Sequence, residues 1–203
     1  MPRSAFMSLT EGVGFLTSGG DQVRFKMELR EKNDFYETPP IAVRLLLENE
    51  HFEGRTWEPA CGAGAISRVL IEAGLDVTSS DLIDRGYGTV HDFLSADLDP
   101  ADAPVNIITN PPYRQAEKFV RHSLKNCTGK VAMLLRLSFL EGQKRNALFK
   151  ETPLSKVLVF SRRIAPARGG ISEELDGFGG MVAYAWFIWA HGHEGPPVLG
   201  WLK

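Results

Sequence analysis

Apolar residues follow two alternating patterns along the chain, one typical of helices and the other of buried strands. Stripes at helical spacing begin at Ile41, Ile66 and Ala116, and a further helix is predicted over 139–149. Thr38 is predicted to cap the first of these helices, ahead of two prolines. Short continuous apolar runs predict strands buried on both faces. Strands are predicted at 55–60, 75–80, 105–109, 131–137, 157–160 and 182–189, and the segments at 157–160 (VLVF) and 182–189 (VAYAWFIW) are such runs.

This alternation predicts an α/β fold with a doubly wound, mainly parallel sheet. Such a Rossmann-like sheet would have about seven strands, with helices on both faces. Residues 34–190 are expected to form one domain after a loosely structured lead-in, 1–33, which has a short helix near 24–31. Residues 161–180 form a long glycine- and arginine-rich loop, and 191–203 a polar tail.

Composition narrows the class of protein. Hydrophobic residues make up 43% and charged residues 24%, as in soluble globular proteins. The net charge of -2 gives no overall positive field, so any contact with nucleic acid needs a local patch. Cys61 and Cys127 are too far apart for a disulfide framework or zinc spacing, which favours a cytoplasmic location. The longest apolar run, 181–190, is about half the length needed to span a membrane.

A glycine turn and an acidic residue mark the first candidate site. Gly62 and Gly64 follow a predicted strand and open a predicted helix, where the backbone can approach a ligand and free N–H groups suit a carboxylate. Asp81 lies roughly 20 residues beyond the turn, the spacing at which an acid meets ribose hydroxyls in doubly wound folds. A tight structural turn and a solvated aspartate are the alternatives, and the third glycine of a dinucleotide fingerprint is missing.

The tetrapeptide Asn110-Pro111-Pro112-Tyr113 is the most specific motif. It follows an apolar strand, and its prolines hold the local backbone extended. The Asn110 amide oxygen and the Pro111 carbonyl could accept hydrogen bonds from the two N–H groups of an aromatic amine. These hydrogen bonds would make the amine nitrogen more nucleophilic. The Tyr113 ring could stack on a base. The alternative is a proline turn that ends a strand.

Three segments together resemble the N6-adenine DNA methyltransferases. They are Phe35-Tyr36-Glu37-Thr38-Pro39, Glu58 to Gly64 (EPACGAG) and the tetrapeptide at 110–113. The resemblance implies S-adenosylmethionine as cofactor, adenine in nucleic acid, foremost DNA, as the methyl acceptor, and Asn110 to Tyr113 as the catalytic residues. Glutamate at 58 replaces the family's more usual aspartate. The chain has no room for the target-recognition domain of sequence-specific members and is similar to compact phage or prophage enzymes.

The resemblance also implies roles for the cofactor-binding residues. Asp81 would hold the ribose, and Asp92 with Phe93 the adenine ring. The remaining positions would hold the methionine part of the cofactor: Tyr36, Thr38, Glu58, Ala60, Cys61, Gly62 and Gly64.

Basic residues form a candidate substrate-binding patch for phosphates. Glu173, Glu174 and Asp176 lie in the same loop, so an ordinary solvated surface is the alternative. The patch would comprise Arg114, Arg162, Arg163 and Arg168, with Lys144 and Arg145.

Two rival functions are also compatible with the sequence. One is methylation of a protein glutamine or a ribosomal RNA guanine, and the other is cofactor binding without catalysis. His191, His193 and Glu194 are too few for a metal site, so no metal is expected. Trp186 and Trp189 are expected to pack in the core.

Overall fold

The computed structural model describes residues 35–95, 98, 101–168 and 177–203, all within the unit Lys32–Lys203. The lead-in at 1–33 with its predicted helix and residues 169–176 of the arginine-rich loop lie outside the described residues. The side chains of Lys144 and Arg168 are likewise not described.

A single large sheet organises the described chain, and it confirms the predicted α/β class. Its strand order is β10-β7-β9-β6-β5-β2-β3-β4. Strand β9 is antiparallel to both of its neighbours, and every other pair in this sheet is parallel. The strands are β2 (Thr56–Glu58), β3 (Val77–Asp81), β4 (Thr89–Val90), β5 (Asn106–Thr109), β6 (Lys130–Arg136), β7 (Leu154–Phe160), β9 (Tyr184–Ala190) and β10 (Val198–Leu202).

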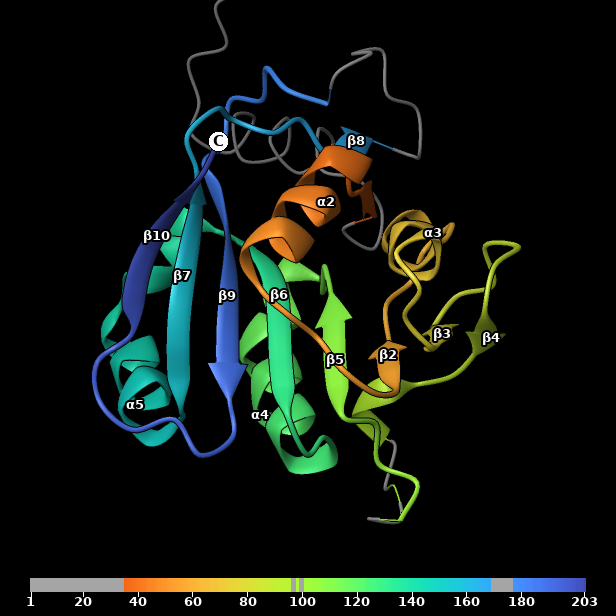
Figure 1. Cartoon of the computed structure of the whole chain (residues 1–203), viewed down its shortest axis with the longest axis horizontal. Helices are drawn as coiled ribbons and strands as arrows, with labels where there is room; N and C mark the ends of the chain where they lie inside the picture. The colour runs from red at the N-terminus through yellow and green to blue at the C-terminus, as the bar shows by residue number, and fades with distance from the viewer. Residues whose placement is uncertain (1–34, 96–97, 99–100, 169–176) are drawn as a thin grey trace, which may run out of the picture. The chain divides into compact units, whose positions relative to one another are not determined.

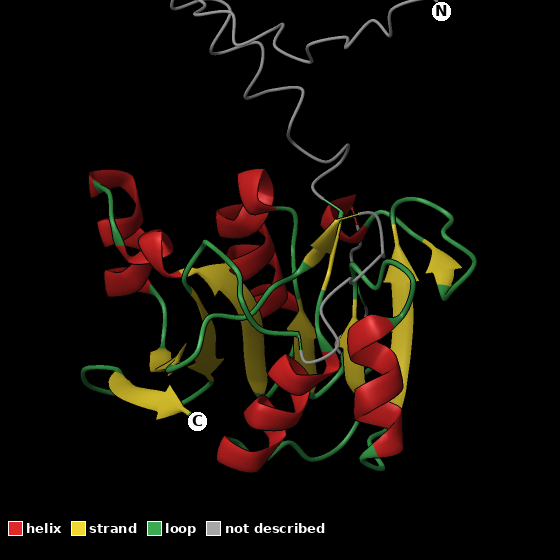
Figure 2. Ribbon diagram, turned by 90° about the horizontal axis from the view of Figure 1, so that it is seen from above, coloured by secondary structure: helices red, strands yellow, loops and turns green. Residues whose placement is uncertain are grey.

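Helices cover both faces of this sheet. Figures 1 and 2 show α2 (Pro40–Asn49) and α3 (Ala65–Glu72) on one face, and α4 (Ala116–Asn126) and α5 (Gln143–Glu151) on the other. None of the helices in the described ranges combines the length and apolar character that crossing a membrane would require.

Strand β9 divides its side chains between the two layers of the core. Trp186 and Ile188 pack in the cluster under α2 and α3, whereas Phe187 and Trp189 pack in the cluster under α4 and α5. The indole N–H of Trp186 donates to the Ala42 carbonyl at 2.9 Å. Both tryptophans are fully buried, so the prediction that they pack in the core is confirmed.

The prediction that residues 191–203 form only a polar tail is wrong for the last part of that segment. Val198–Leu202 forms β10, which pairs in parallel with β7 and lies at the edge of the sheet. Leu202 is 1% exposed, whereas Leu199 and Trp201 remain exposed. This short segment follows two prolines and has one buried apolar side chain, so its pattern of apolar and polar residues is too weak to predict a strand. The strand therefore depends on pairing with β7.

Two helix starts also differ from the prediction. Pro39, not Thr38, is the N-cap residue of α2, and no side chain caps this helix. The helix predicted from residue 139 is divided: a 3-10 turn, η4, covers Leu137–Leu140, and α5 begins after Gly142, whose φ is 106°. Glycine tolerates this left-handed backbone, so the chain can turn between the two segments.

A second, two-stranded sheet joins segments far apart in sequence. Strand β1 (Tyr36–Glu37) pairs antiparallel with β8 (Ala167–Arg168), and Tyr36 lies opposite Arg168. The described part of the arginine-rich loop therefore returns to the segment that precedes α2.

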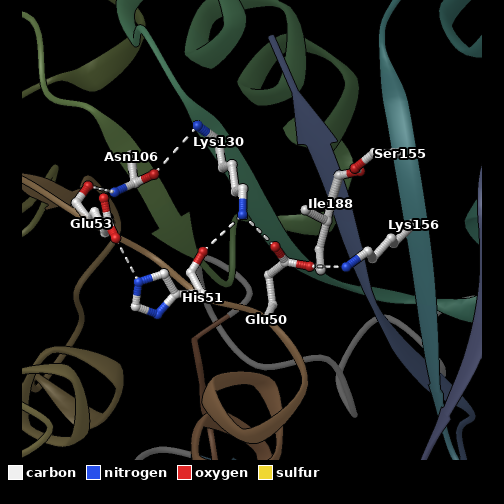
Figure 3. Close-up of polar contacts among 8 residues, drawn as sticks. All are labelled: Glu50, His51, Glu53, Asn106, Lys130, Ser155, Lys156 and Ile188. Atoms are coloured by element: carbon white, nitrogen blue, oxygen red, sulfur yellow. Dashed lines mark hydrogen bonds and ion pairs between the residues drawn. The ribbon is translucent and has the colours of Figure 1, made fainter. Parts of the chain in front are cut away.

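A polar network ties α2 to the sheet at the amino ends of the parallel strands (Figure 3). The Glu50 carboxylate forms ion pairs with Lys130 and, at 2.6 Å, with Lys156. Lys130 also donates to the His51 carbonyl at 2.8 Å. The Asn106 amide donates to the Glu53 carbonyl at 2.7 Å. The segment after α2 is thus fixed to β5, β6 and β7.

Candidate active site

The candidate residues come together at the carboxyl edge of the sheet. Glu58 ends β2, Asp81 ends β3 and Asn110 directly follows β5. Strand β2 pairs in parallel with both β3 and β5, so these three ends are neighbours. Ligand sites of open α/β sheets form at this edge.

Asn110 is held by the segment before α2. Its amide nitrogen donates to the Tyr36 carbonyl at 3.2 Å and to the Thr38 hydroxyl at 3.1 Å. A carbonyl oxygen only accepts hydrogen bonds, so the nitrogen must face Tyr36 and the orientation of the amide is determined. The hydroxyl of Thr38 was expected to cap α2, but it accepts the hydrogen bond from Asn110 instead.

The same segment also touches the glycine turn. Gly62 has φ 55°, and a Cβ there would lie 2.6 Å from Cε2 of Phe35. Only glycine admits this close approach of the aromatic ring. Phe35 is three residues from Thr38, so residues 35–38 connect the Gly62 turn with Asn110. The turn and the tetrapeptide thus share one edge and one bridging segment.

Asp81 stabilises the turn directly. One carboxylate oxygen accepts the Gly62 N–H at 2.9 Å, and the other accepts the Ile83 N–H at 2.9 Å. Each oxygen keeps a further lone pair, so the partly exposed carboxylate can still accept bonds from hydroxyls.

Aromatic rings backed by arginines border the turn. A Cβ on Gly64, whose φ is 86°, would lie 2.6 Å from the Tyr87 ring. The Arg68 guanidinium lies 4.6 Å from the centre of the Tyr87 ring, and the Arg85 guanidinium 3.9 Å from that of Phe35. These partners could not be predicted from the sequence, because glycine spacing carries no information about which side chain approaches.

Glu58 and Cys61 point into the protein. Glu58 is 1% exposed, and its carboxylate accepts the Ser67 N–H at 2.8 Å and the Ser67 hydroxyl. Burial raises the pKa of Glu58 to about 8. Cys61 is buried, and its thiol lies 3.5 Å from the Tyr87 carbonyl. Burial, with the charges of Glu58 and Asp81, raises the pKa of Cys61 to about 12, so the thiol is a poor nucleophile.

Asp92 and Phe93 differ in accessibility. Asp92 is exposed, and its carboxylate accepts the Leu94 N–H at 3.1 Å. Phe93 is 2% exposed, with its ring centre 5.0 Å from those of Trp57 and Phe119. Asp92 is therefore open to a ligand, whereas Phe93 packs in the core.

Tyr113 lies across the ends of two strands. Its hydroxyl donates to that of Tyr184 at 3.2 Å, and its ring stacks with Tyr36 at 6.0 Å between centres. The Arg136 guanidinium lies 4.7 Å from the centre of the Tyr113 ring. Burial raises the pKa of Tyr113 well above its usual range. Arg136 and Tyr184 were not predicted as site residues, although their positions at strand ends were a usable signal.

The arginines of the proposed patch are only partly brought together. Arg162 and Arg163 are exposed and directly follow the carboxyl end of β7, on the same edge as Asn110. Arg163 donates to the Met181 carbonyl at 3.0 Å. Arg114 is exposed in the short turn η3 (Tyr113–Gln115), and the backbone of Arg168 lies opposite Tyr36.

A cavity lies apart from these residues, at the opposite edge of the sheet. This open cavity of about 610 Å³ at the amino ends of the strands is lined by residues including His51, Arg55 and Asp76. Across the described ranges, no group of three or more histidine, cysteine or acidic residues is arranged to hold a metal ion.

Known proteins share the fold but little of the sequence, which matches no protein-family model and no curated protein. A modification subunit of a proposed type I restriction enzyme from Vibrio vulnificus superposes with a TM-score of 0.58 and 12% identity, over 88% of this chain and 48% of that one. The chain thus spans about half the length of that subunit.

Two structures described as RNA methyltransferases are also similar to this chain. A proposed RNA methyltransferase from Pyrococcus horikoshii has a TM-score of 0.56 and 12% identity, over 84% of this chain and 97% of that one. The 23S rRNA methyltransferase ErmE has a TM-score of 0.55 and 17% identity, over 79% of this chain and 72% of that one. The described chain therefore shares its Rossmann-like fold with these two methyltransferases.

Proposed function

We propose that this protein transfers a methyl group from S-adenosylmethionine to the exocyclic amine of adenine in DNA. The observation that supports this most is the position of Asn110. Its amide nitrogen is bound by Tyr36 and Thr38, so its oxygen is left as an acceptor at the carboxyl edge of the sheet, beside the glycine turn.

The residues around the turn fit the proposed cofactor. Gly62 and Gly64 let the Phe35 and Tyr87 rings close against the turn, and the start of α3 offers N–H groups for the methionine carboxylate. Asp81 would accept the ribose hydroxyls, and exposed Asp92 would accept a bond from the adenine amine. We assign Glu58 and Phe93 to the scaffold of this pocket, because both are buried. The cofactor would supply a methyl group on a positively charged sulfur.

The role of the tetrapeptide follows from the electronic structure of an aromatic amine. The lone pair of adenine N6 is delocalised into the ring, which makes the nitrogen a poor nucleophile. Hydrogen bonds from its two N–H groups to the Asn110 amide oxygen and the Pro111 carbonyl would favour tetrahedral geometry at N6. The cofactor would supply an electrophilic methyl group: the new nitrogen–carbon bond would replace the carbon–sulfur bond, whose electron pair would stay on sulfur, and the proton lost from the amine would pass to water. No covalent link to the protein is needed.

The likeness to solved structures is compatible with more than one substrate. One similar structure is described as a restriction-modification subunit and two as RNA methyltransferases. Adenine in DNA is favoured by the segments at 35–39 and 58–64, which resemble the N6-adenine enzymes. Guanine in RNA and protein glutamine become outcomes of the experiment.

The decisive experiment is a methyl-transfer assay with labelled cofactor. Single- and double-stranded DNA, RNA and a glutamine-containing release-factor-like peptide are supplied separately, and the digested DNA is analysed for N6-methyladenine. Label in N6-methyladenine from DNA is the expected result. Label only in guanine of RNA, or only in the peptide, would contradict the proposal, and cofactor binding without any transfer would indicate a binding protein.

Asn110→Ala is the sharpest variant. It should lower the transfer rate by about 10²–10³-fold, because an acceptor aimed at the reacting nitrogen is lost. The affinity for the cofactor, measured by calorimetry, should fall much less than the transfer rate, because Asn110 affects the cofactor only through its bonds to Tyr36 and Thr38. Asp81→Ala is the matched control and should weaken cofactor binding itself. Comparable loss of both properties in Asn110→Ala would mean that Asn110 is structural.

A further inference from the structure

Arg136 occupies a distinctive position beside the tetrapeptide. It is the last residue of β6 and lies opposite Tyr184 of β9. Tyr113 bridges this pair, because its hydroxyl binds Tyr184 and its ring lies 4.7 Å from the Arg136 guanidinium. Three elements thus fix the place of one arginine at the carboxyl edge.

The guanidinium of Arg136 has unused hydrogen-bonding capacity. Its side chain is exposed, and within the described ranges it makes the ring contact with Tyr113 but no hydrogen bond or ion pair. Arg145 and Arg163, by contrast, each donate to a backbone carbonyl, of Glu141 and Met181 respectively. Arginine stacked on a ring is held in orientation while its N–H groups stay free.

Free guanidinium N–H groups in a fixed plane match the geometry of a phosphate. Two parallel N–H bonds to phosphate oxygens are a common arginine contact, and they are charge-assisted. Strands β5 and β6 are paired neighbours, so Arg136 lies next to the strand that presents Asn110.

We propose that Arg136 binds a backbone phosphate of the nucleotide whose base is presented to Asn110. This inference rests on the proposed function, because it assumes a polynucleotide substrate. It assigns to Arg136 a phosphate contact that the sequence alone suggested for other basic residues, namely Arg114, Lys144, Arg145 and the arginines of 161–180. The net charge of -2 makes such a local contact necessary for holding a phosphodiester chain.

The test measures binding rather than turnover. Fluorescence anisotropy with a labelled, adenine-containing oligodeoxynucleotide is recorded from about 50 to 200 mM salt, in the presence of S-adenosylhomocysteine. Arg136→Ala should weaken binding about tenfold, as expected when one charge-assisted hydrogen-bonding partner is removed. The slope of log affinity against log salt should become shallower by about 0.7–0.9, the value for one phosphate.

Two further variants separate charge from structure. Arg136→Lys keeps the charge but loses the planar fork, so it should restore the salt slope with only part of the affinity. Arg55→Ala removes the same charge at the amino ends of the strands, where Arg55 donates to the Ala103 carbonyl, and should leave affinity and slope unchanged. If Arg136→Ala does not fold, Arg136→Gln, which keeps much of the aliphatic stem, is compared with Arg136→Lys instead.

The outcomes distinguish this inference from the proposed function. Wild-type binding with an unchanged slope in Arg136→Ala would overturn the role of Arg136 and leave the proposed function intact. A lower melting temperature with no restoration of the slope in Arg136→Lys would also overturn it, because the role would then be structural. Failure of the wild-type protein to bind any oligonucleotide would overturn both, and binding only to the release-factor-like peptide would point to a protein substrate.

Discussion

The position of Glu58 indicates a structural role rather than contact with the cofactor, because its buried carboxyl group binds Ser67. The longer side chain of glutamate reaches Ser67, in the first turn of α3, rather than the open edge of the sheet. Ser67 in turn lies 2.6 Å from the Ser79 hydroxyl on β3. The carboxyl group thus links β2, α3 and β3, and we expect it to support the turn without touching the cofactor.

The raised pKa of Glu58 leads to a pH-dependent prediction. With a folded pKa of about 8, the group keeps its proton in the folded state while the unfolded chain ionises above 4.5. Stability is therefore full below pH 4.5 and is lost as pH rises to about 8, by up to about 1.4 kcal/mol per pH unit.

Glu58→Gln keeps an oxygen for the Ser67 N–H and cannot ionise. Thermal unfolding across pH should show the variant to be more stable than wild type at pH 8 and similar to it at about pH 4, where the wild-type carboxyl is protonated in both states. Cofactor affinity should be unchanged. Parallel pH profiles, or loss of cofactor binding, would count against the structural role.

At the scale of elements, Glu50 connects the segment after α2 to two strands (Figure 3). The carboxylate is 5% exposed and pairs with Lys130 and Lys156. Burial alone would raise the pKa of Glu50, but hydrogen bonds from Lys130 and Lys156 outweigh it and lower the pKa below its usual value. This contribution to stability is present above the unfolded pKa and is lost as pH falls through the lowered folded pKa.

Glu50→Gln should lower the free energy of unfolding at pH 7 by about 1–3 kcal/mol, because two lysines lose their charged partner. The difference from wild type should shrink in acid, where Glu50 itself becomes protonated. Urea unfolding at pH 7 and at about pH 3 measures both effects. Glu53→Gln is the matched control: its side chain is 83% exposed and pairs with His51, so the change should be under about 0.5 kcal/mol. Equal effects of the two variants would contradict the prediction.

At the scale of the whole molecule, binding of a polyanion depends on where the charges lie. The net charge is -2, yet Arg162 and Arg163 follow β7 at the same edge of the sheet as Asn110. Nucleic-acid binding should therefore be salt-dependent even though the protein is acidic.

Replacing Arg162 and Arg163 together by alanine should weaken oligonucleotide binding and flatten its salt dependence. The slope should fall by about 0.7–0.9 for each phosphate that the variant no longer neutralises. The same anisotropy titration measures this. Arg121→Ala should have no such effect, since Arg121 lies on α4 and is paired with Glu117 and Glu151. A double variant with the wild-type slope would show that the two arginines belong to an ordinary solvated surface.

Much of the fold could be predicted from local patterns. Strand β9 and the interior of β6 are continuous apolar runs, because a sheet covered on both faces needs apolar side chains on both. The motifs at 58–64 and 110–113 were located in the same way, since each glycine or proline requirement is a property of a few adjacent residues.

The partners of those motifs could not be predicted. Thr38 accepts a bond from Asn110 across 72 positions, and the hydroxyls of Tyr113 and Tyr184 meet across 71. Such contacts depend on the order of strands in the sheet, which no local period encodes. The sequence by itself thus determined the class of fold and the placement of its motifs at strand ends, because burial and backbone conformation act locally. Only the tertiary structure decided that Glu58 points inward, that Arg136 meets Tyr113 and that the tail adds a strand, because each requires distant segments to pack together.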